Sequence, residues 1–222
     1  MMGLYLNRQD RFFEHFSRPA GLNFSENRAV GFGVVARDWD ADGDEDLLVA
    51  CGHVHYRPDR GTMPQLPMLL ENVDGQTLRR VSIDDPFFQQ PRVGRGLATA
   101  DFDSDGDSDI VATQLDGPPS LVENHCPAGR HHWLRIRLIG TRTARQPIGT
   151  RVLLDWPGGT MMRQLVGGGS YLSDSEPVLE FAWPRSSEQQ PPTVRLRIEW
   201  TDGTVTEVAQ ANPDQTLTLV QP

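Results

Sequence analysis

The stretch DWDADGDED, residues 38–46, recurs as DFDSDGDSD at residues 101–109. Both copies read D-x-D-x-D-G-x-x-D, and the second begins 63 residues after the first. Carboxylates at alternate positions, with a glycine that permits a sharp turn, can direct their oxygens at one hard cation. The repeated pattern therefore predicts two Ca²⁺ sites.

The expected ligands in each copy are the side chains of the first, third, fifth and ninth residues, with the main-chain carbonyl of the seventh. In the first copy these are Asp38, Asp40, Asp42 and Asp46, with the carbonyl of Asp44. In the second copy they are Asp101, Asp103, Asp105 and Asp109, with the carbonyl of Asp107. The alternative for each copy is an acidic, solvated hairpin turn, because Asp and Gly are common turn residues.

Neither copy fits an EF-hand, whose loop needs a bidentate glutamate at its twelfth position and a helix afterwards. The twelfth positions here are Val49 and Ala112, and the loops are followed by the short apolar runs 47–50 and 110–112. Such runs favour buried strands. We therefore expect two strand–Ca²⁺ loop–strand units.

The acidity of the chain comes from these two loops. The 222 residues carry a formal net charge of −9, and eleven of the thirty acidic residues lie in the two loops. The other nineteen acids face twenty-one basic residues, so the rest of the chain is close to neutral and the charge says little about a basic partner. Every basic residue is arginine, which excludes a Schiff-base lysine and a P-loop lysine.

The repeat is wider than the aspartate loops. Residues 33–36 (GVVA) and 96–99 (GLAT) precede the two loops in the same register, and an apolar strand that ends in Asn occurs at 4–7, 69–72 and 121–124. Short strands with a period near sixty residues are typical of β-propeller blades. Residues 1–126 supply about two blades, and a ring needs roughly four to eight. We therefore expect missing N-terminal blades or another chain to complete it.

A second pattern begins after a short linker at residues 126–130. Apolar and polar residues alternate at 133–138 and 194–200, and further strands are predicted at 150–156, 160–166, 177–182, 203–208 and 215–220. Seven strands without helical periodicity predict an antiparallel sandwich or barrel over residues 131–222. The expected fold is therefore all-β, a partial propeller followed by an antiparallel β-sandwich-like domain.

These segments together resemble a known family. The repeats of residues 1–126 resemble FG-GAP/VCBS repeats, the blades of integrin α-subunit propellers. The C-terminal part resembles the ASPIC/UnbV domain, which follows such repeats in cartilage acidic protein-like proteins. The matching segments are 132–134, 138–142, 148–152, 167–173 (GGGSYLS), 198–204 and 214–215.

The resemblance implies a calcium-loaded propeller segment and a β-rich C-terminal module, usually in exported proteins, with no established reaction. We therefore predict a non-enzymatic recognition or adhesion module that binds a protein or a glycan in an extracellular, periplasmic or cell-surface location. The chain itself starts with no signal peptide, and no run of apolar residues suits a membrane span. Nucleic acid is not an expected partner. The alternative is a polysaccharide-active enzyme or accessory subunit that uses the repeats as a scaffold.

Several weaker signals leave two interpretations open. His53 and His55 could ligate zinc or mark a polar strand end, and residues 167–170 could cradle a phosphate or form a tight strand connection. Residues 23–25 form a glycosylation sequon, and Cys51 and Cys126 could form a disulfide. The basic cluster of Arg135, Arg137, Arg142 and Arg145 could bind a polyanion or be an exposed strand face and loop.

Overall fold

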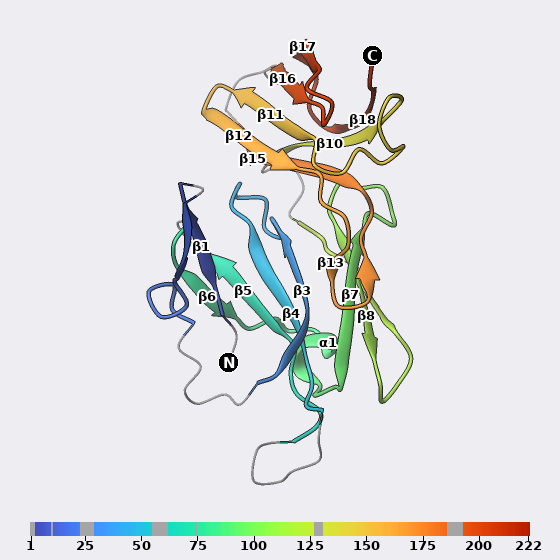
Figure 1. Ribbon diagram of the computed structural model, residues 1–222. Coiled ribbons are helices and arrows are strands. Elements are labelled where there is room, and N and C mark those ends of the chain that lie inside the picture. The colour runs from blue at the N-terminus through green and yellow to red at the C-terminus, as the bar shows by residue number, and fades with distance from the viewer. Residues whose placement is uncertain are drawn as a thin grey trace.

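The computed structural model describes residues 3–9, 11–22, 29–54, 62–73, 75–126, 131–185 and 193–222. The sequon at 23–25, His55 and the linker residues 127–130 lie outside these ranges. The described residues form β-strands and loops, with one helical turn, α1 (Pro86–Gln89). Residues up to 126 form one body and residues from 131 onward form a second body packed against it (Figure 1).

The N-terminal body consists of three antiparallel sheets in chain order. A hairpin pairs β1 (Tyr5–Arg8) with β2 (Phe12–His15). A four-stranded meander follows, made of β3 (Gly31–Arg37), β4 (Asp46–Cys51), β5 (Met68–Asn72) and β6 (Leu78–Val81). A three-stranded meander comes last, made of β7 (Gly94–Ala100), β8 (Asp109–Gln114) and β9 (Ser120–Val122).

The internal repeat is preserved in strand register. Arg37 pairs with Asp46 across β3 and β4, and Ala100 pairs with Asp109 across β7 and β8. Both pairs of strands also share a register shift, between Gly31 and Val34 in one and between Gly94 and Leu97 in the other. The two aspartate stretches therefore join equivalent strands, as the sequence predicts.

Apolar side chains fill the space between neighbouring sheets. One cluster joins the four-stranded and three-stranded meanders through residues such as Val35, Leu48, Leu97 and Ile110. A second cluster lies on the other side of the four-stranded meander and includes Met68 and Leu70, together with Leu4 and Phe16 from the first hairpin region. The sheets of the described residues do not close into a ring, so the propeller remains a prediction.

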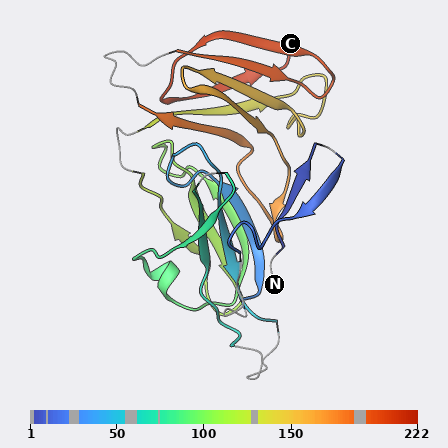
Figure 2. The same ribbon diagram turned by 90° about the vertical axis from the view of Figure 1, so that its left-hand side faces the viewer.

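The C-terminal body is a two-layer sandwich (Figure 2). One layer has the order β15 (Val178–Pro184), β10 (His131–Ile139), β18 (Gln215–Val220). The other has the order β12 (Gly159–Gln164), β11 (Arg151–Trp156), β16 (Val194–Glu199), β17 (Val205–Ala211). Its core includes Leu134 and Ile136 from the first layer and Val152, Leu154 and Ile198 from the second, all fully buried. All seven strands predicted from the sequence occur.

One strand pair contradicts the antiparallel prediction: β18 lies parallel to β10. The chain passes from β17 in one layer to β18 in the other, so β18 is not joined to β10 by a hairpin and its direction is not fixed by one. The sandwich is therefore mixed, with every other pair of its strands among the described residues antiparallel.

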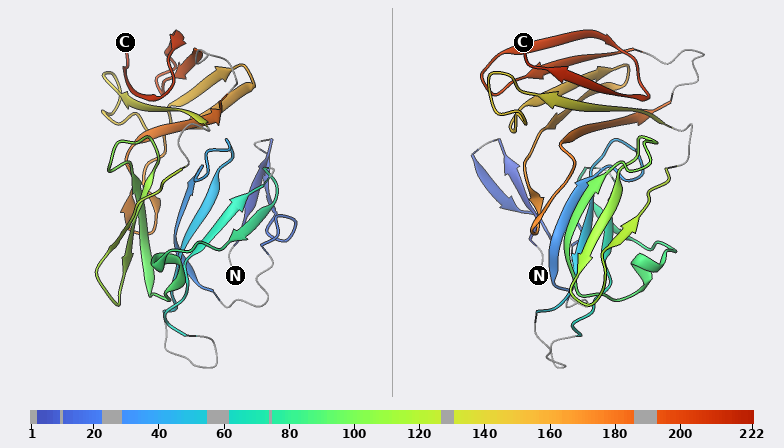
Figure 3. Two further views of the ribbon diagram at one scale, coloured as in Figure 1. Left: turned by 180° about the vertical axis from the view of Figure 1, so that it is seen from behind. Right: turned by 90° about the vertical axis from the view of Figure 1, so that its right-hand side faces the viewer.

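The glycine-rich stretch forms a small hairpin, β13 (Gly169–Ser170) and β14 (Ser173–Asp174), which is the tight strand connection expected as one of two interpretations. It leaves the sandwich and lies against β3 and β7 of the N-terminal body (Figures 1 and 3). Gly96 permits this approach, because a Cβ atom there would lie only 2.3 Å from Oγ of Ser173. No helix follows the glycines, so the phosphate-cradle interpretation is wrong.

Replacing Leu154 with alanine tests the sandwich core. The side chain is fully buried, so we expect the substitution to lower the free energy of unfolding by about 2–5 kcal/mol. Leu172→Ala is the matched control, because the Leu172 side chain is 89% exposed and should change stability by about 0.5 kcal/mol or less. Urea denaturation measures both variants, and equal effects would contradict the assigned core.

Candidate metal centres

The two aspartate stretches adopt the same backbone conformation; we call them the first loop (residues 38–46) and the second loop (residues 101–109). Ala41 and Gly43 have φ angles of 59° and 101°, and the equivalent Ser104 and Gly106 have 66° and 102°. Left-handed values at non-glycine residues are uncommon and carry a conformational cost. Their recurrence at equivalent positions shows that one specific loop geometry is built twice.

The aspartate at the ninth position of each loop is buried and accepts hydrogen bonds from the backbone of two segments. Asp46 accepts hydrogen bonds from the backbone N–H of Trp39 (3.1 Å) and of Asn72 (2.7 Å). Asp109 accepts the equivalent bonds from Phe102 (2.8 Å) and Asn124 (2.9 Å). The recurring strand that ends in Asn thus donates its backbone N–H to the aspartate loop, which ties the third strand of each meander to the loop.

The first loop brings Asp38, Asp40 and Asp42 together, with one carboxylate oxygen of each within 4.8 Å of the others. Asp46 is not part of this group. Burial raises the pKa of Asp38 to about 7, and the negative charges of the neighbouring aspartates raise it while the N–H of Gly43 lowers it. Burial also raises the pKa of Asp46, to about 6. A bound dication would favour the ionised forms, so the crowding suits a cation.

The second loop brings Asp101, Asp103 and Asp109 together within the same distance limit. Asp105 instead forms a group with Asp103 and His125. Burial, with the neighbouring aspartates, raises the pKa of Asp105. The sequence pattern does not predict that His125 lies beside the second loop, because His125 is sixteen residues beyond it. The one local indication is that His125 directly follows Asn124, the residue that ends the recurring strand. The carbonyl roles of Asp44 and Asp107 stay predictions.

Asp101 shows best that the second loop suits a cation. Its side chain is only 3% exposed. Its Oδ2 atom accepts hydrogen bonds from the N–H of Gly106 (3.2 Å) and from Nη1 of Arg135 (2.8 Å). Its Oδ1 atom is buried and has no hydrogen-bond partner. A buried carboxylate oxygen without a partner is costly, and a cation held by Asp101, Asp103 and Asp109 would supply that partner.

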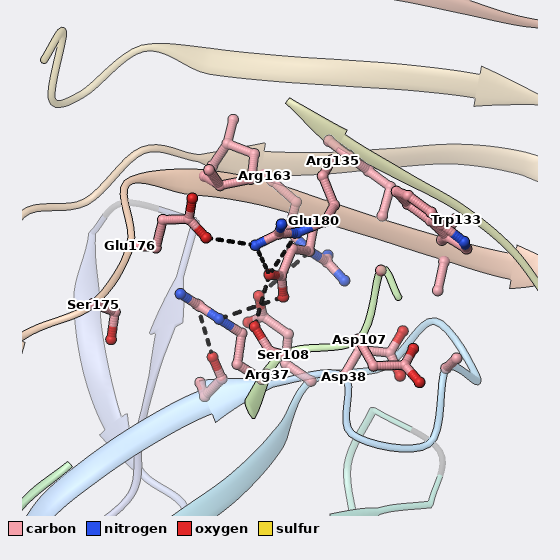
Figure 4. A pocket seen from close by; sticks show the side chains of 18 of the residues that line it. Arg37, Asp38, Asp107, Ser108, Trp133, Arg135, Arg163, Ser175, Glu176 and Glu180 are labelled. Atoms are coloured by element: carbon pink, nitrogen blue, oxygen red, sulfur yellow. Dashed lines mark hydrogen bonds and ion pairs between the residues drawn. The ribbon is translucent and has the colours of Figure 1, made fainter. Parts of the chain in front are cut away.

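The C-terminal sandwich contacts both loops, and a cavity of about 630 Å³ lies between the two bodies. Figure 4 shows Glu180 between the guanidinium groups of Arg37 and Arg135, which lie 3.6 and 3.3 Å from its carboxylate oxygens. Ser108 of the second loop donates to Glu180 as well, at 2.7 Å. Arg163 donates to the carbonyl of Gly43 in the first loop, at 3.2 Å. Charged groups therefore link each loop to the sandwich.

Arginine-rich strand β10 does not present the basic face considered from the sequence. Arg135 is buried and pairs with three acids, Asp101, Glu176 and Glu180. Arg137 is half-exposed and pairs with Glu176 at 2.7 Å, whereas Arg142 and Arg145 lie in an exposed loop. An exposed polyanion site that includes Arg135 is therefore wrong.

Cys51 and Cys126 are not joined by a disulfide, so the pairing considered from the sequence does not form. Cys51 is buried in the apolar cluster beside β5, and Cys126 contacts both loops. The backbone N–H of Cys126 donates to Asp107 (2.8 Å) and its Sγ approaches the carbonyl of Asp40 (3.4 Å).

The zinc interpretation needs His55, which lies outside the described residues. Within the described ranges, no helix has the length and apolar character that crossing a bilayer requires.

Comparison with known proteins supports part of the resemblance. Residues 140–222 match the family model described as ASPIC and UnbV. The chain is 26% identical over 220 residues to cartilage acidic protein 1 of Mus musculus, and the aligned region covers 97% of this chain and 32% of the relative. The chain is 24% identical over 225 residues to cartilage acidic protein 1 of Homo sapiens, and the aligned region covers 99% of this chain and 32% of that relative. The chain thus spans about a third of the length of these relatives.

Alanine substitution at the equivalent glycines, Gly106 and Gly43, tests the contact between the second loop and the sandwich. Both have a φ near +100°, so alanine is strained at either position. A Cβ atom at Gly106 would also lie 2.4 Å from the indole ring of Trp133, whereas at Gly43 the nearest atom is 3.8 Å away. We expect Gly106→Ala to lower the free energy of unfolding by about 1–3 kcal/mol more than Gly43→Ala. Equal losses in urea denaturation would contradict this contact.

Glu176→Gln tests the ion pairs of Arg135 and Arg137 through their pH dependence. Burial alone would raise the pKa of Glu176, but the hydrogen bonds and charges of Arg135 and Arg137 hold it below its ordinary 4.5. Because the folded pKa is lowered, ionised Glu176 adds stability above pH 4.5 that is lost as the pH falls through the folded pKa.

The stability difference between wild type and Glu176→Gln should therefore be largest near neutral pH and shrink as the pH falls below 4.5. Urea denaturation at several pH values measures this difference. Glu207→Gln, which breaks an exposed ion pair with Arg197, is the control and should change stability little at any pH. A difference for Glu176→Gln that does not vary with pH would contradict the assignment.

Proposed function

We propose that the chain is a calcium-binding recognition module without catalytic activity, in which one Ca²⁺ ion binds at each aspartate loop. The observation that carries the proposal is the buried, unpartnered Oδ1 of Asp101 within a group of three carboxylates. The first loop supports it through the same backbone conformation and a second group of three carboxylates. Hard oxygen donors suit Ca²⁺, whose coordination geometry is variable, better than Mg²⁺, which demands near-octahedral geometry.

Bound Ca²⁺ would stabilise the edge of the sheets that faces the sandwich. The proposed side-chain ligands are Asp38, Asp40 and Asp42 in the first loop and Asp101, Asp103, Asp105 and Asp109 in the second, where Asp105 is the equivalent of Asp42 and forms a group with Asp103. When bound, the ion supplies positive charge that offsets the repulsion among these carboxylates. Since the ligands converge only in the folded chain, binding and folding stability are coupled.

The stacked meanders are proposed to be FG-GAP/VCBS-type propeller blades that further sheets complete, from the same longer protein or from another chain. The β1–β2 hairpin supports this proposal. Its Tyr5, Phe12 and Phe13 side chains are all more than half exposed, which is typical of a surface that another element covers. The similarity to relatives about three times as long is consistent with additional blades.

The ligand is proposed to be a protein or a glycan in an extracellular, periplasmic or cell-surface setting. Calcium loops of this exposed kind bind with affinities from roughly micromolar to millimolar, which suits the calcium concentration outside cells. The similarity to cartilage acidic protein 1 agrees with this setting but leaves the ligand to be found by binding experiments.

Calcium removal tests the proposal directly. At a Ca²⁺ concentration of 100 times Kd each site should add about 2.7 kcal/mol, which corresponds to roughly 5–10 °C in Tm for a chain of this size. EDTA should therefore lower the Tm in differential scanning calorimetry, and excess Ca²⁺ should restore it. Isothermal titration should give two ions for the wild type.

Loop variants assign the two ions. Asp42→Ala and Asp105→Ala should each remove about one bound ion, because each takes away a carboxylate of one loop. Glu45→Gln is the matched control: it removes an acid of the first loop that is not a proposed ligand, so both ions should remain. A Tm unaffected by chelation, together with no heat of Ca²⁺ binding, would overturn the proposal.

A further inference from the structure

The first aspartates of the two loops, Asp38 and Asp101, differ in one respect. In the first loop, Asp38 accepts a hydrogen bond on each oxygen from its own loop: Oδ1 from the N–H of Asp42 (3.0 Å) and Oδ2 from that of Gly43 (2.9 Å). In the second loop, Oδ2 of Asp101 accepts from both the N–H of Gly106 and Arg135, and Oδ1 accepts from neither. The presence of Arg135 thus coincides with a free oxygen on the equivalent aspartate.

Arg135 is itself fixed in place. It projects from the middle strand of its layer, β10, and its side chain is 7% exposed. Its Nη2 atom donates to Glu176 at 2.6 Å and lies 3.3 Å from Glu180, while Nη1 donates to Asp101. A guanidinium group held by three carboxylates has little freedom to move, so the orientation it gives to Asp101 is well defined.

The positive charge of Arg135 repels a cation that binds at Asp101. This repulsion has to be compared with the benefit that Arg135 provides by orienting Asp101. Glu176 and Glu180 both contact Arg135, and their two negative charges more than offset its single positive charge. The nearby Arg37 and Arg137 in turn pair with these glutamates. Together with Asp101, which Arg135 also contacts, the group has three positive and three negative charges, so its net repulsion of a cation is weak compared with the benefit of a correctly oriented ligand.

We propose that Arg135 is a positioning residue of the second cation site: it holds Oδ2 of Asp101, so that Oδ1 is left for the ion, and thereby couples Ca²⁺ binding to docking of the C-terminal sandwich. The proposal rests on the proposed function, since it needs a cation in the second loop. It goes further by assigning part of that site to the other body of the molecule.

The coupling between Ca²⁺ binding and docking of the sandwich follows from the contacts that join the two bodies near Arg135. Trp133, two residues earlier on β10, packs against Gly106 of the second loop. Beside it, the N–H of Glu176 donates to the carbonyl of Thr99 (2.8 Å), and the N–H of Thr99 donates to Oγ of Ser175 (3.1 Å). An ion that stabilises the second loop therefore also stabilises these contacts, and by linkage the reverse holds.

Arg135→Lys tests the positioning role, because lysine keeps the charge but cannot contact three carboxylates in a fixed fork. In the Asp42→Ala background, where only the second loop would bind Ca²⁺, the substitution should weaken Ca²⁺ binding about 10- to 100-fold in isothermal titration. In the Asp105→Ala background, where only the first loop would bind, it should have no effect. Arg137→Lys, on the same strand and paired with Glu176 only, is the control and should leave both affinities unchanged.

Hydrogen exchange tests the coupling without substituting Arg135, in case Arg135→Lys does not fold. Ca²⁺ should slow exchange of the Thr99 and Glu176 amides in the wild type and in Asp42→Ala, but not in Asp105→Ala. A wild type that binds no Ca²⁺ would overturn the proposed function. A wild type that binds two ions, with the second site insensitive to Arg135→Lys or with exchange at Thr99 and Glu176 insensitive to Ca²⁺, would overturn this inference alone.

Discussion

Crowding of carboxylates at one edge of the N-terminal sheets is the constraint on which this structure depends. Eleven acidic side chains lie in two loops of nine residues each, and their mutual repulsion must be offset for the loops to pack against another body. Backbone N–H groups offset part of it, most clearly at the buried Asp46 and Asp109. Arginines of the sandwich offset another part, and the proposed cations complete the compensation.

The sandwich is therefore part of the environment of both loops. Arg163 contacts the first loop, and Arg135 and Trp133 contact the second. The β13–β14 hairpin adds a further contact on β3 and β7, for which the absence of a side chain at Gly96 is needed. The close-packed apolar core of the sandwich supports the strands from which these side chains project.

The prediction from sequence was most reliable where the signal is local. Alternating apolar residues predicted the strands of the sandwich, and the repeated Asp–Gly pattern predicted two equivalent loops between equivalent strands. It failed where the outcome depends on distant segments. The parallel pairing of β18 with β10, the position of His125 and the burial of Arg135 all involve residues that are far apart in the chain or belong to different bodies.

The amino-acid sequence by itself determined the all-β composition, the two-fold repeat and the acidic loops, because strand periodicity, glycine conformation and carboxylate spacing act over a few residues. Only the tertiary structure decided which oxygens remain free for a ligand and which residues support them. In a strand where apolar and polar residues alternate, the sequence pattern around an arginine is the same whether its side chain faces solvent or a buried aspartate. Asp101 and Arg135 meet because the two bodies dock, and that contact depends on the shape of both surfaces.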